Sequence, residues 1–172
     1  MLLYNNKPLF AKNLSLKIRK KIWLKQEYLN FTGSHKDRET LFLIKAAKKK
    51  NFGSIGCAST GNLGISLAFF SRILNIKCHV WVNKRSTKSD LIKLLGGKVY
   101  YKKKMSLVEM YNKSDNYFKK HNIFSANPCN SVKKYAANSV IIQELKPILN
   151  KVEVIVCCVN NGSHYLGLKN YI

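Results

Sequence analysis

The stretch SIGCASTGNLG at residues 54–64 decides the fold class of this chain. Its first five residues form a short, mostly apolar run, which predicts a buried strand over residues 54–58. A small polar turn follows, and from about Gly61 the apolar side chains recur at helical spacing, at Leu63, Leu67, Phe70 and Leu74. The next apolar run, residues 77–82, predicts a second strand. A strand, a helix and another strand in this order indicate parallel strands and an α/β fold.

The same alternation continues on both sides of this unit. We expect further strands at residues 22–27, 98–101 and 152–159, and further helices at residues 36–50, 88–95, 107–121 and 132–147. Ser34 is the expected N-cap of the helix that begins near Lys36, with Asp37 as its capping partner. Residues 152–159 are almost continuously apolar, as expected for a strand whose sheet is covered on both faces. The predicted fold class is therefore α/β, with parallel sheets and flanking helices.

The composition is strongly basic. The chain has 172 residues, of which 46% are apolar, and a formal net charge of +23 from 31 Lys and Arg against 8 Asp and Glu. This length gives one ordinary domain or two small ones, with enough apolar material for a core. Only four of the basic residues are Arg, whereas 18 residues are Asn, a mixture typical of coding DNA rich in A and T. Because phosphate and base recognition usually relies on arginine, we expect non-specific polyanion binding and no specific nucleic-acid partner.

The sequence carries no signal for a membrane or a secretory route. No stretch approaches the roughly 20 apolar residues of a spanning helix, and the first six residues are too briefly apolar for a secretory signal. The cysteines are odd in number, without Cys-x-x-Cys spacing, which indicates buried thiols in a reducing compartment and no zinc site. They are Cys57, Cys78, Cys129, Cys157 and Cys158. We expect a soluble, cytoplasmic protein without a membrane partner.

Three polar loops stand next to predicted strands, at residues 30–38, 57–64 and 159–164. In open parallel sheets, ligands bind at the carboxyl ends of the strands. In the first loop, Lys36 falls in the first turn of a helix, where the helix dipole disfavours an ammonium and favours the neutral amine that Schiff-base chemistry requires. The alternative is that one of the many lysines of this chain falls at a helix start by chance.

The other two loops have the composition of anion sites. In the second loop, the backbone N–H groups with Ser59, Thr60 and Asn62 could bind a carboxylate or a ring hydroxyl. An ordinary N-cap would need only Ser59 or Thr60. In the third loop, a turn that contains Gly162 could cradle a phosphate.

Taken together and in this order, the loops resemble those of pyridoxal-phosphate enzymes with the tryptophan-synthase-β-like fold, also called fold type II. Residues 29–38, LNFTGSHKDR, look like the lysine motif of the family, and residues 57–62, CASTGN, look like its asparagine loop. Asn127-Pro128 and residues 159–164 fit its later landmarks. Lys-Asp-Arg and Ala-Ser-Thr-Gly-Asn look most like threonine synthase, whereas the His35-Lys36 pair is similar to the tryptophan synthase β chain.

The resemblance implies a role for each matched position. Lys36 would form a Schiff base with pyridoxal 5′-phosphate and shuttle protons to and from substrate carbons. Asn62 would hydrogen-bond the 3′-oxygen of the pyridine ring. Ser59, Thr60 and Gly61 would hold the α-carboxylate of the substrate, and Asn161, Gly162 and Ser163 would receive the phosphate of the cofactor.

The resemblance also implies a domain organisation. Residues 1–50 would be the N-terminal part of a large domain that carries the lysine motif, and residues 51–147 would be a small α/β domain. Residues 148–172 would start the remaining part of the large domain. Because family members continue well past this point, we expect an incomplete large domain in a chain that looks C-terminally truncated, either a fragment or a decayed remnant.

The implied activity is that of a lyase similar to threonine synthase, which eliminates phosphate from O-phosphohomoserine and adds water to give threonine. Other reactions of small amino acids on the same scaffold stay open, namely serine or threonine dehydration and β-replacement as in cysteine or tryptophan synthase. An inactive remnant that binds polyanions non-specifically also stays open, as does a homodimer of a full-length protein.

Overall fold

The computed structural model of the chain describes residues 7–59, 61–102, 105–127, 133–159 and 162–170. Its centre is a four-stranded parallel sheet with the strand order β5-β4-β3-β6. The strands are β3 (Ser54–Ala58), β4 (Lys77–Val82), β5 (Lys98–Tyr101) and β6 (Phe124–Ser125). The predicted α/β class with a parallel sheet and flanking helices is confirmed, and the first three strands have the predicted bounds.

The strand order reverses between β3 and β6. On one side of β3 lie β4 and then β5, with Ile55 opposite Cys78 and Val80 opposite Val99. On the other side lies β6, with Ile55 opposite Phe124. In sheets of this kind, the point of reversal opens a crevice at the carboxyl ends of the strands, where ligands bind. The carboxyl ends of β3 and β6 are therefore the part of the sheet best placed for a site.

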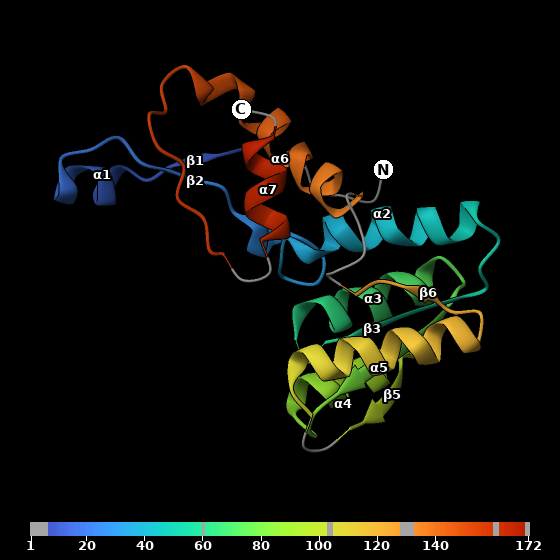
Figure 1. Ribbon diagram of the computed structural model, residues 1–172. Helices are drawn as coiled ribbons and strands as arrows, with labels where there is room; N and C mark the ends of the chain where they lie inside the picture. The colour runs from blue at the N-terminus through green and yellow to red at the C-terminus, as the bar shows by residue number, and fades with distance from the viewer. Residues whose placement is uncertain (1–6, 60, 103–104, 128–132, 160–161, 171–172) are drawn as a thin grey trace.

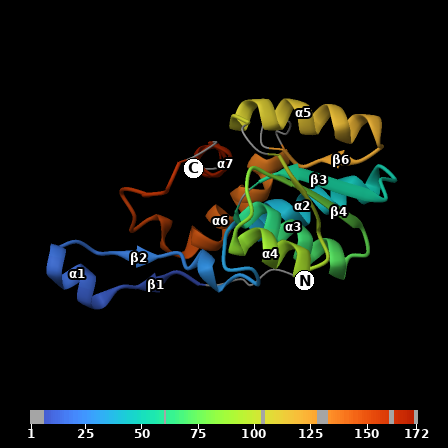
Figure 2. The ribbon, with the colours of Figure 1, turned by 90° about the horizontal axis from the view of Figure 1, so that it is seen from below.

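Helices cover both faces of the sheet (Figure 2). On one face, α5 (Leu107–Lys120) contributes Met110 and Phe118 to a small apolar cluster with Trp81. On the other face lie α3 (Asn62–Ile73) and α4 (Thr87–Leu94), and α2 (Lys36–Lys49) packs on α3. The main core fills this second face, and its buried side chains include Leu43, Ile44, Ile55, Leu67, Phe70 and Val80.

Two further helices pack together beside α2 and away from the sheet (Figure 1). They are α6 (Lys133–Leu149) and α7 (Ser163–Lys169), which share an apolar cluster of Ile141, Ile142, Leu145 and Leu168. The sequence predicted that α6 ends near Pro147, but the helix continues to Leu149. Proline removes one helical hydrogen bond, and the packing of Ile148 and Leu149 against the cluster holds the last turn. Within the described ranges, no helix has the length and apolar character needed to cross a membrane.

The N-terminal residues form an arm that extends away from the sheet in both views (Figures 1 and 2). The arm consists of β1 (Leu9–Phe10), α1 (Lys12–Ile18) and β2 (Trp23–Leu24), and β1 pairs with β2 in the antiparallel sense. Of the strand predicted at residues 22–27, only Trp23 and Leu24 are in a strand, so the rest of that prediction is wrong. A short 3-10 helix, η1 (Glu27–Leu29), follows. The reason is that β1 offers only two partners and that the Glu27 carboxylate bonds to Arg38 on α2.

Residues 152–159, predicted as a buried strand, form no strand in the structure. Val154 and Val156 are 74% and 92% exposed. A strand needs a neighbour to take up its backbone hydrogen bonds, and none of the strands in the described residues pairs with this segment. The apolar pattern indicates that the segment favours burial, but it does not show which strand would pair with it. The prediction of a strand at residues 152–159 is therefore wrong.

The prediction of buried thiols holds for the two cysteines of the sheet. Cys57 and Cys78 are buried on β3 and β4, and burial raises the pKa of the Cys78 thiol well above its usual value. Cys157 is half-buried and Cys158 is exposed, because the strand expected around them is absent. Cys129 lies outside the described residues.

Candidate active site

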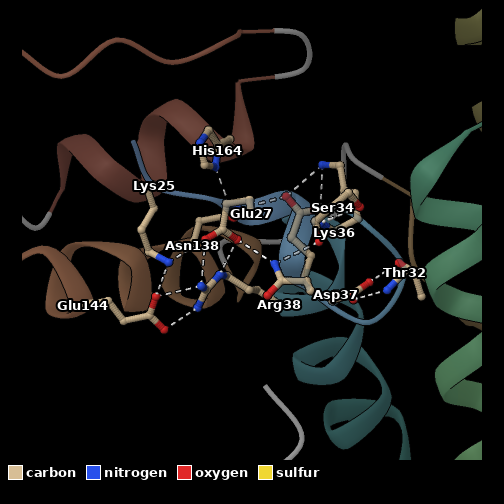
Figure 3. A network of polar contacts seen from close by, with 12 residues as sticks. Lys25, Glu27, Thr32, Ser34, Lys36, Asp37, Arg38, Asn138, Glu144 and His164 are labelled. Atoms are coloured by element: carbon tan, nitrogen blue, oxygen red, sulfur yellow. Dashed lines mark hydrogen bonds and ion pairs between the residues drawn. The ribbon is translucent and has the colours of Figure 1, made fainter. Parts of the chain in front are cut away.

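Lys36 is the first residue of α2, where the sequence predicted the helix to begin. The predicted capping pair is wrong, because His35 holds the cap position without a side-chain capping bond. The Asp37 carboxylate turns instead to Thr32, which donates its backbone N–H at 2.8 Å and its hydroxyl (Figure 3). The Ser34 hydroxyl accepts from the Lys36 N–H at 3.3 Å. These contacts close the loop before α2 and fix the point from which the Lys36 side chain projects.

The Lys36 amine lies beside the Glu39 carboxylate, with Nζ 3.0 Å from each of its oxygens. The Lys36 side chain is 16% exposed and that of Glu39 is 1% exposed. Sequence reasoning missed Glu39, although a spacing of three residues in a helix places both side chains on the same face. The amine is therefore partly accessible and is paired with a buried negative charge.

Glu39 connects Lys36 to the loop predicted to bind phosphate. Ser163, the first residue of α7, donates its hydroxyl to Glu39 Oε1 at 2.8 Å. Asn138 on α6 donates its side-chain N–H to the same oxygen at 2.9 Å. An amine, a hydroxyl and an amide from three helices thus converge on one carboxylate. Asn138 gave no signal in the sequence, because it falls outside the apolar face that predicted α6.

Gly162 occupies the cap of α7 with a φ of 81°, in the left-handed region that favours glycine. This conformation fits the tight turn predicted at this position. The predicted phosphate-binding residue Asn161 lies outside the described residues, as does the predicted substrate-binding residue Thr60. The described part of the loop predicted to bind phosphate therefore adjoins the Lys36 amine through the contact between Ser163 and Glu39.

His35 and His164, the neighbours of Lys36 and Ser163, lie against each other with ring centroids 4.6 Å apart. Burial lowers the pKa of both rings, and the nearby Lys36 charge adds to this effect, so that the pKa of His35 is about 4. Both rings are therefore mainly neutral at pH 7. They line a cavity of about 1270 Å³ whose apolar wall includes Ile141, Leu145 and Leu168.

Arg38 is fully buried between two carboxylates (Figure 3). Its guanidinium donates to Glu27 at 2.7 and 2.8 Å and makes two bonds of 2.8 Å to Glu144. Lys25 adds ion pairs of 3.0 Å to Glu27 and 2.8 Å to Glu144. Burial alone would raise the pKa of Glu27, but the bonds and charges of Arg38 and Lys25 lower it to about 2. The network ties residues 25–27, which follow the N-terminal arm, and α6 to the first turn of α2, next to Lys36.

The second predicted loop leaves the carboxyl end of β3. Ser59 still bonds to β4, through an N–H that donates at 3.0 Å, and its hydroxyl accepts from the Gly61 N–H at 3.3 Å. Asn62 begins α3 with an exposed side chain, whose Oδ1 accepts from Lys88 Nζ at 3.2 Å. The contacts of the described residues thus link Asn62 to Lys88 and do not link it to Lys36.

Asn127 fixes the point at which this loop leaves the sheet. Its Oδ1 accepts from the Ala58 N–H at 2.6 Å, and its Nδ2 donates to the Ser114 hydroxyl and the Asp115 carboxylate at 2.8 Å each. The pairing of β6 with β3 ends here, so the Asn127 side chain supplies the acceptor that a further strand residue would supply. Pro128, the other half of this landmark, lies outside the described residues.

The starts of the helices that carry these loops lie on one side of the molecule. In Figure 1, α2 and α3 run in the same direction, so their amino ends lie on the same side. The start of α7 contacts the first turn of α2 through Ser163 and Glu39. The first and third predicted loops are therefore joined by direct contacts, and the second lies on the same side without such a contact among the described residues.

Comparison with known proteins identifies what these loops are similar to. The sequence pattern of the family described as "Pyridoxal-phosphate dependent enzyme" matches residues 1–172. The tryptophan synthase β chain of Campylobacter jejuni is 32% identical over 100 residues, which covers 53% of this chain and 25% of that protein. The threonine synthase of a Bacillus species is 37% identical over 78 residues, which covers 45% of this chain and 22% of that protein.

A solved structure shows the same fold over nearly the whole chain. Maize serine racemase superposes with a TM-score of 0.86 at 18% sequence identity, and the match covers 98% of this chain and 53% of the racemase. At this identity the likeness establishes the fold alone. The chain therefore spans about half the length of this structural neighbour.

Proposed function

Because the chain belongs to the family of pyridoxal-phosphate dependent enzymes, we propose that it acts on a small amino acid, with pyridoxal 5′-phosphate as cofactor and Lys36 as catalytic residue. The observation that carries this proposal is the convergence of the Lys36 amine and the Ser163 hydroxyl on the Glu39 carboxylate. The lysine motif and the phosphate loop, far apart in the sequence, meet there as a single site requires. The relatives are longer than this chain, and the match covers only 25% of the tryptophan synthase β chain. The proposed activity is therefore that of a protein of the relatives' full length.

The residues present fit the chemistry of the cofactor. A site for pyridoxal phosphate needs an amine for the aldehyde and hydrogen-bond donors for the phosphate. Lys36 offers a partly exposed amine, while Ser163 and Asn138 already donate to an anionic group. We therefore assign the aldehyde to Lys36 and the phosphate to Gly162, Ser163 and the adjoining Asn161.

When bound, the cofactor supplies an electron sink that stabilises negative charge on the α-carbon of the substrate. Lys36 takes the proton from that carbon and returns it. Residues 59–61 bind the substrate carboxylate through N–H and hydroxyl groups, at the crevice where the strand order reverses. Asn62 would hydrogen-bond the ring oxygen of the cofactor through its Nδ2, since its contact with Lys88 uses Oδ1.

Within the family, we propose elimination of phosphate from O-phosphohomoserine followed by hydration to threonine. The support is the Lys36-Asp37-Arg38 sequence and the 37% identity to a threonine synthase. The second candidate is β-replacement, which is favoured by the identity to a tryptophan synthase β chain. The fold hosts many reactions, so the choice between them depends on substrate tests.

Titration of the purified protein with pyridoxal phosphate tests the cofactor assignment. We expect a saturable visible absorbance band that the Lys36→Ala variant lacks. Lys45→Ala is the matched control, because Lys45 is an exposed lysine on the same helix and its removal leaves the band unchanged. A wild-type protein that develops no saturable band would contradict the assignment.

Substrate profiling separates the candidate reactions. Release of inorganic phosphate from O-phosphohomoserine, with formation of threonine, is the result expected for the first candidate. Pyruvate from serine or 2-oxobutyrate from threonine would instead indicate dehydration. Consumption of serine only in the presence of indole or a thiol would indicate β-replacement.

A further inference from the structure

Glu39 places a carboxylate where the proposed function requires donors for a phosphate. Its Oε1 accepts from the Ser163 hydroxyl at 2.8 Å and from Asn138 Nδ2 at 2.9 Å. Each of its two oxygens also lies 3.0 Å from Lys36 Nζ. Ser163 and Lys36 are the groups assigned to the phosphate and the aldehyde of the cofactor, whereas the proposed reaction gives the Glu39 carboxylate no task.

The donors around the Glu39 carboxylate form a buried subsite where three helices meet. Asn138 comes from α6, Ser163 from the start of α7 and Lys36 from the first turn of α2. Asn138 and Ser163 are as buried as Glu39 itself, with exposures of 0% and 3%. Hydroxyl, amide and amine groups donate to carboxylates and to phosphates alike. The geometry is therefore that of an anion subsite, and its occupant is a side chain of the same protein.

A dianionic phosphate cannot share these donors with the carboxylate. The Ser163 hydroxyl has one proton to donate, so it bonds either to Glu39 or to a phosphate oxygen. Both groups are negative, and like charges in contact repel strongly where little water separates them. Arg38 does not offset this repulsion by direct contact, because its guanidinium bonds to Glu27 and Glu144. A bound phosphate therefore requires the Glu39 carboxylate to leave the subsite.

We propose that Glu39 is a specificity-determining residue whose carboxylate occupies the anion subsite of Ser163, Asn138 and Lys36, so that a ligand phosphate binds there only by displacing it. The inference rests on the proposed function, since it concerns the subsite assigned to the cofactor phosphate. It adds Asn138 to the groups that hold this phosphate. Removal of the charge at position 39 therefore strengthens the binding of phosphate.

The test uses the full chain without cofactor and inorganic phosphate as the probe. The dissociation constant of phosphate is measured by isothermal titration calorimetry at pH 7 in the wild type and in Glu39→Gln. We expect the variant to bind phosphate more tightly by about tenfold or more, because a like charge at hydrogen-bond distance from a ligand opposes its binding. Equal affinities, or no measurable binding to the folded variant, would overturn the proposal.

Glu109→Gln provides the matched control, because it makes the same change in net charge at an exposed site. Glu109 forms an ion pair of 2.7 Å with Lys113 on α5, and the two side chains are 44% and 53% exposed. Water and salt screen this carboxylate, so its replacement changes the affinity for phosphate by less than about twofold. An equal gain in both variants would show that only the net charge matters, and would overturn the proposal.

Circular dichroism and thermal unfolding establish whether Glu39→Gln is folded. Should it unfold, Glu39→Asp replaces it in the test, because the aspartate keeps the charge and withdraws it by one methylene group. The affinity for phosphate then rises by a smaller factor, and no rise would overturn the proposal.

Uptake of pyridoxal phosphate at Lys36, measured separately in the wild type and in Glu39→Gln, tests the proposed function. Uptake by both proteins with equal affinities for inorganic phosphate rejects the role of Glu39 alone. Tighter binding of inorganic phosphate by Glu39→Gln, with no uptake of pyridoxal phosphate at Lys36 in either protein, rejects the proposed function alone.

Discussion

Replacement of Glu27 by Gln tests the buried network that holds the first turn of α2. The pKa of Glu27 falls from its ordinary value of 4.5 to about 2 in the folded protein, because its bonds to Arg38 and Lys25 outweigh the effect of burial. A lowered carboxylate pKa stabilises the folded state above the unfolded pKa, and this contribution is lost as the pH falls through the folded pKa. The lowering corresponds to about 3 kcal/mol at pH 7. The side chain is 16% exposed, so we reduce this figure for solvent screening to about 2 to 3 kcal/mol.

The assay is urea unfolding of the wild type and Glu27→Gln at a series of pH values. We expect the variant to be less stable by about 2 to 3 kcal/mol above pH 6, and by only about 1 kcal/mol at pH 3, where the unfolded carboxylate is already protonated. Glu109→Gln, which removes an exposed carboxylate, serves as the control and leaves the unfolding curve unchanged. A difference in stability between the wild type and Glu27→Gln that is absent at pH 7, or equal at pH 7 and pH 3, would contradict a lowered pKa of Glu27.

Three other changes test the support of the candidate site. Asn127→Ala removes the acceptor of the last β3 amide, so we expect a loss of about 1 to 3 kcal/mol and faster hydrogen exchange at that amide; unchanged exchange would contradict this. Gly56→Ala places a Cβ 2.6 Å from Phe118 Cε1, so we expect a loss of about 1 to 3 kcal/mol in urea unfolding, whereas Gly53→Ala, with nothing within 4 Å, is neutral. The pKa of His35 is about 4 in the folded protein against 6.5 ordinarily, so stability falls as the pH drops from 6.5 toward 4. His35→Phe should flatten that part of the stability curve, and an unaltered slope would speak against a buried neutral ring.

Local sequence patterns predicted the elements whose partners are close in the chain. The runs at residues 54–58, 77–82 and 98–101 follow one another with a helix between each pair, so each strand finds its neighbour within one crossover. The strand predicted at residues 152–159 was wrong, although this run is apolar too. Burial of a strand depends on a neighbouring strand, and the sequence pattern does not identify that neighbour. The sequence analysis did not predict the arm formed by β1, α1 and β2, because strands of two residues are too short to show a recognisable pattern.

The residues of the candidate site also differ in whether the sequence could predict them. Lys36 was predicted from its place at a helix start and from the family motif, and Glu39 was within reach of the same reasoning through its spacing of three residues. Asn138 and Glu144 come from a helix about a hundred residues away, and their contacts depend on how α6 packs against α2. A single sequence fixes side-chain spacing within an element, whereas contacts between distant elements emerge only from the packing.

The three residues of the lysine motif have separate tasks in the structure. Lys36 presents its amine to Glu39, Asp37 closes the preceding loop on Thr32, and Arg38 anchors the helix start between two carboxylates. The motif thus combines one group for chemistry with two groups that hold it in place. Lys36, Asp37 and Arg38 are therefore not interchangeable, although all three lie in the first turn of α2.

The role proposed for Lys36 is tested most directly by mapping the amine that captures pyridoxal phosphate. The protein is incubated with limiting cofactor and reduced with borohydride, which converts any carbon–nitrogen double bond at a lysine into a stable adduct, and the adduct is mapped by peptide mass spectrometry. We expect one saturable adduct, at Lys36, that is absent from Lys36→Arg. Adducts spread over the exposed lysines, without saturation and without preference for Lys36, would contradict it.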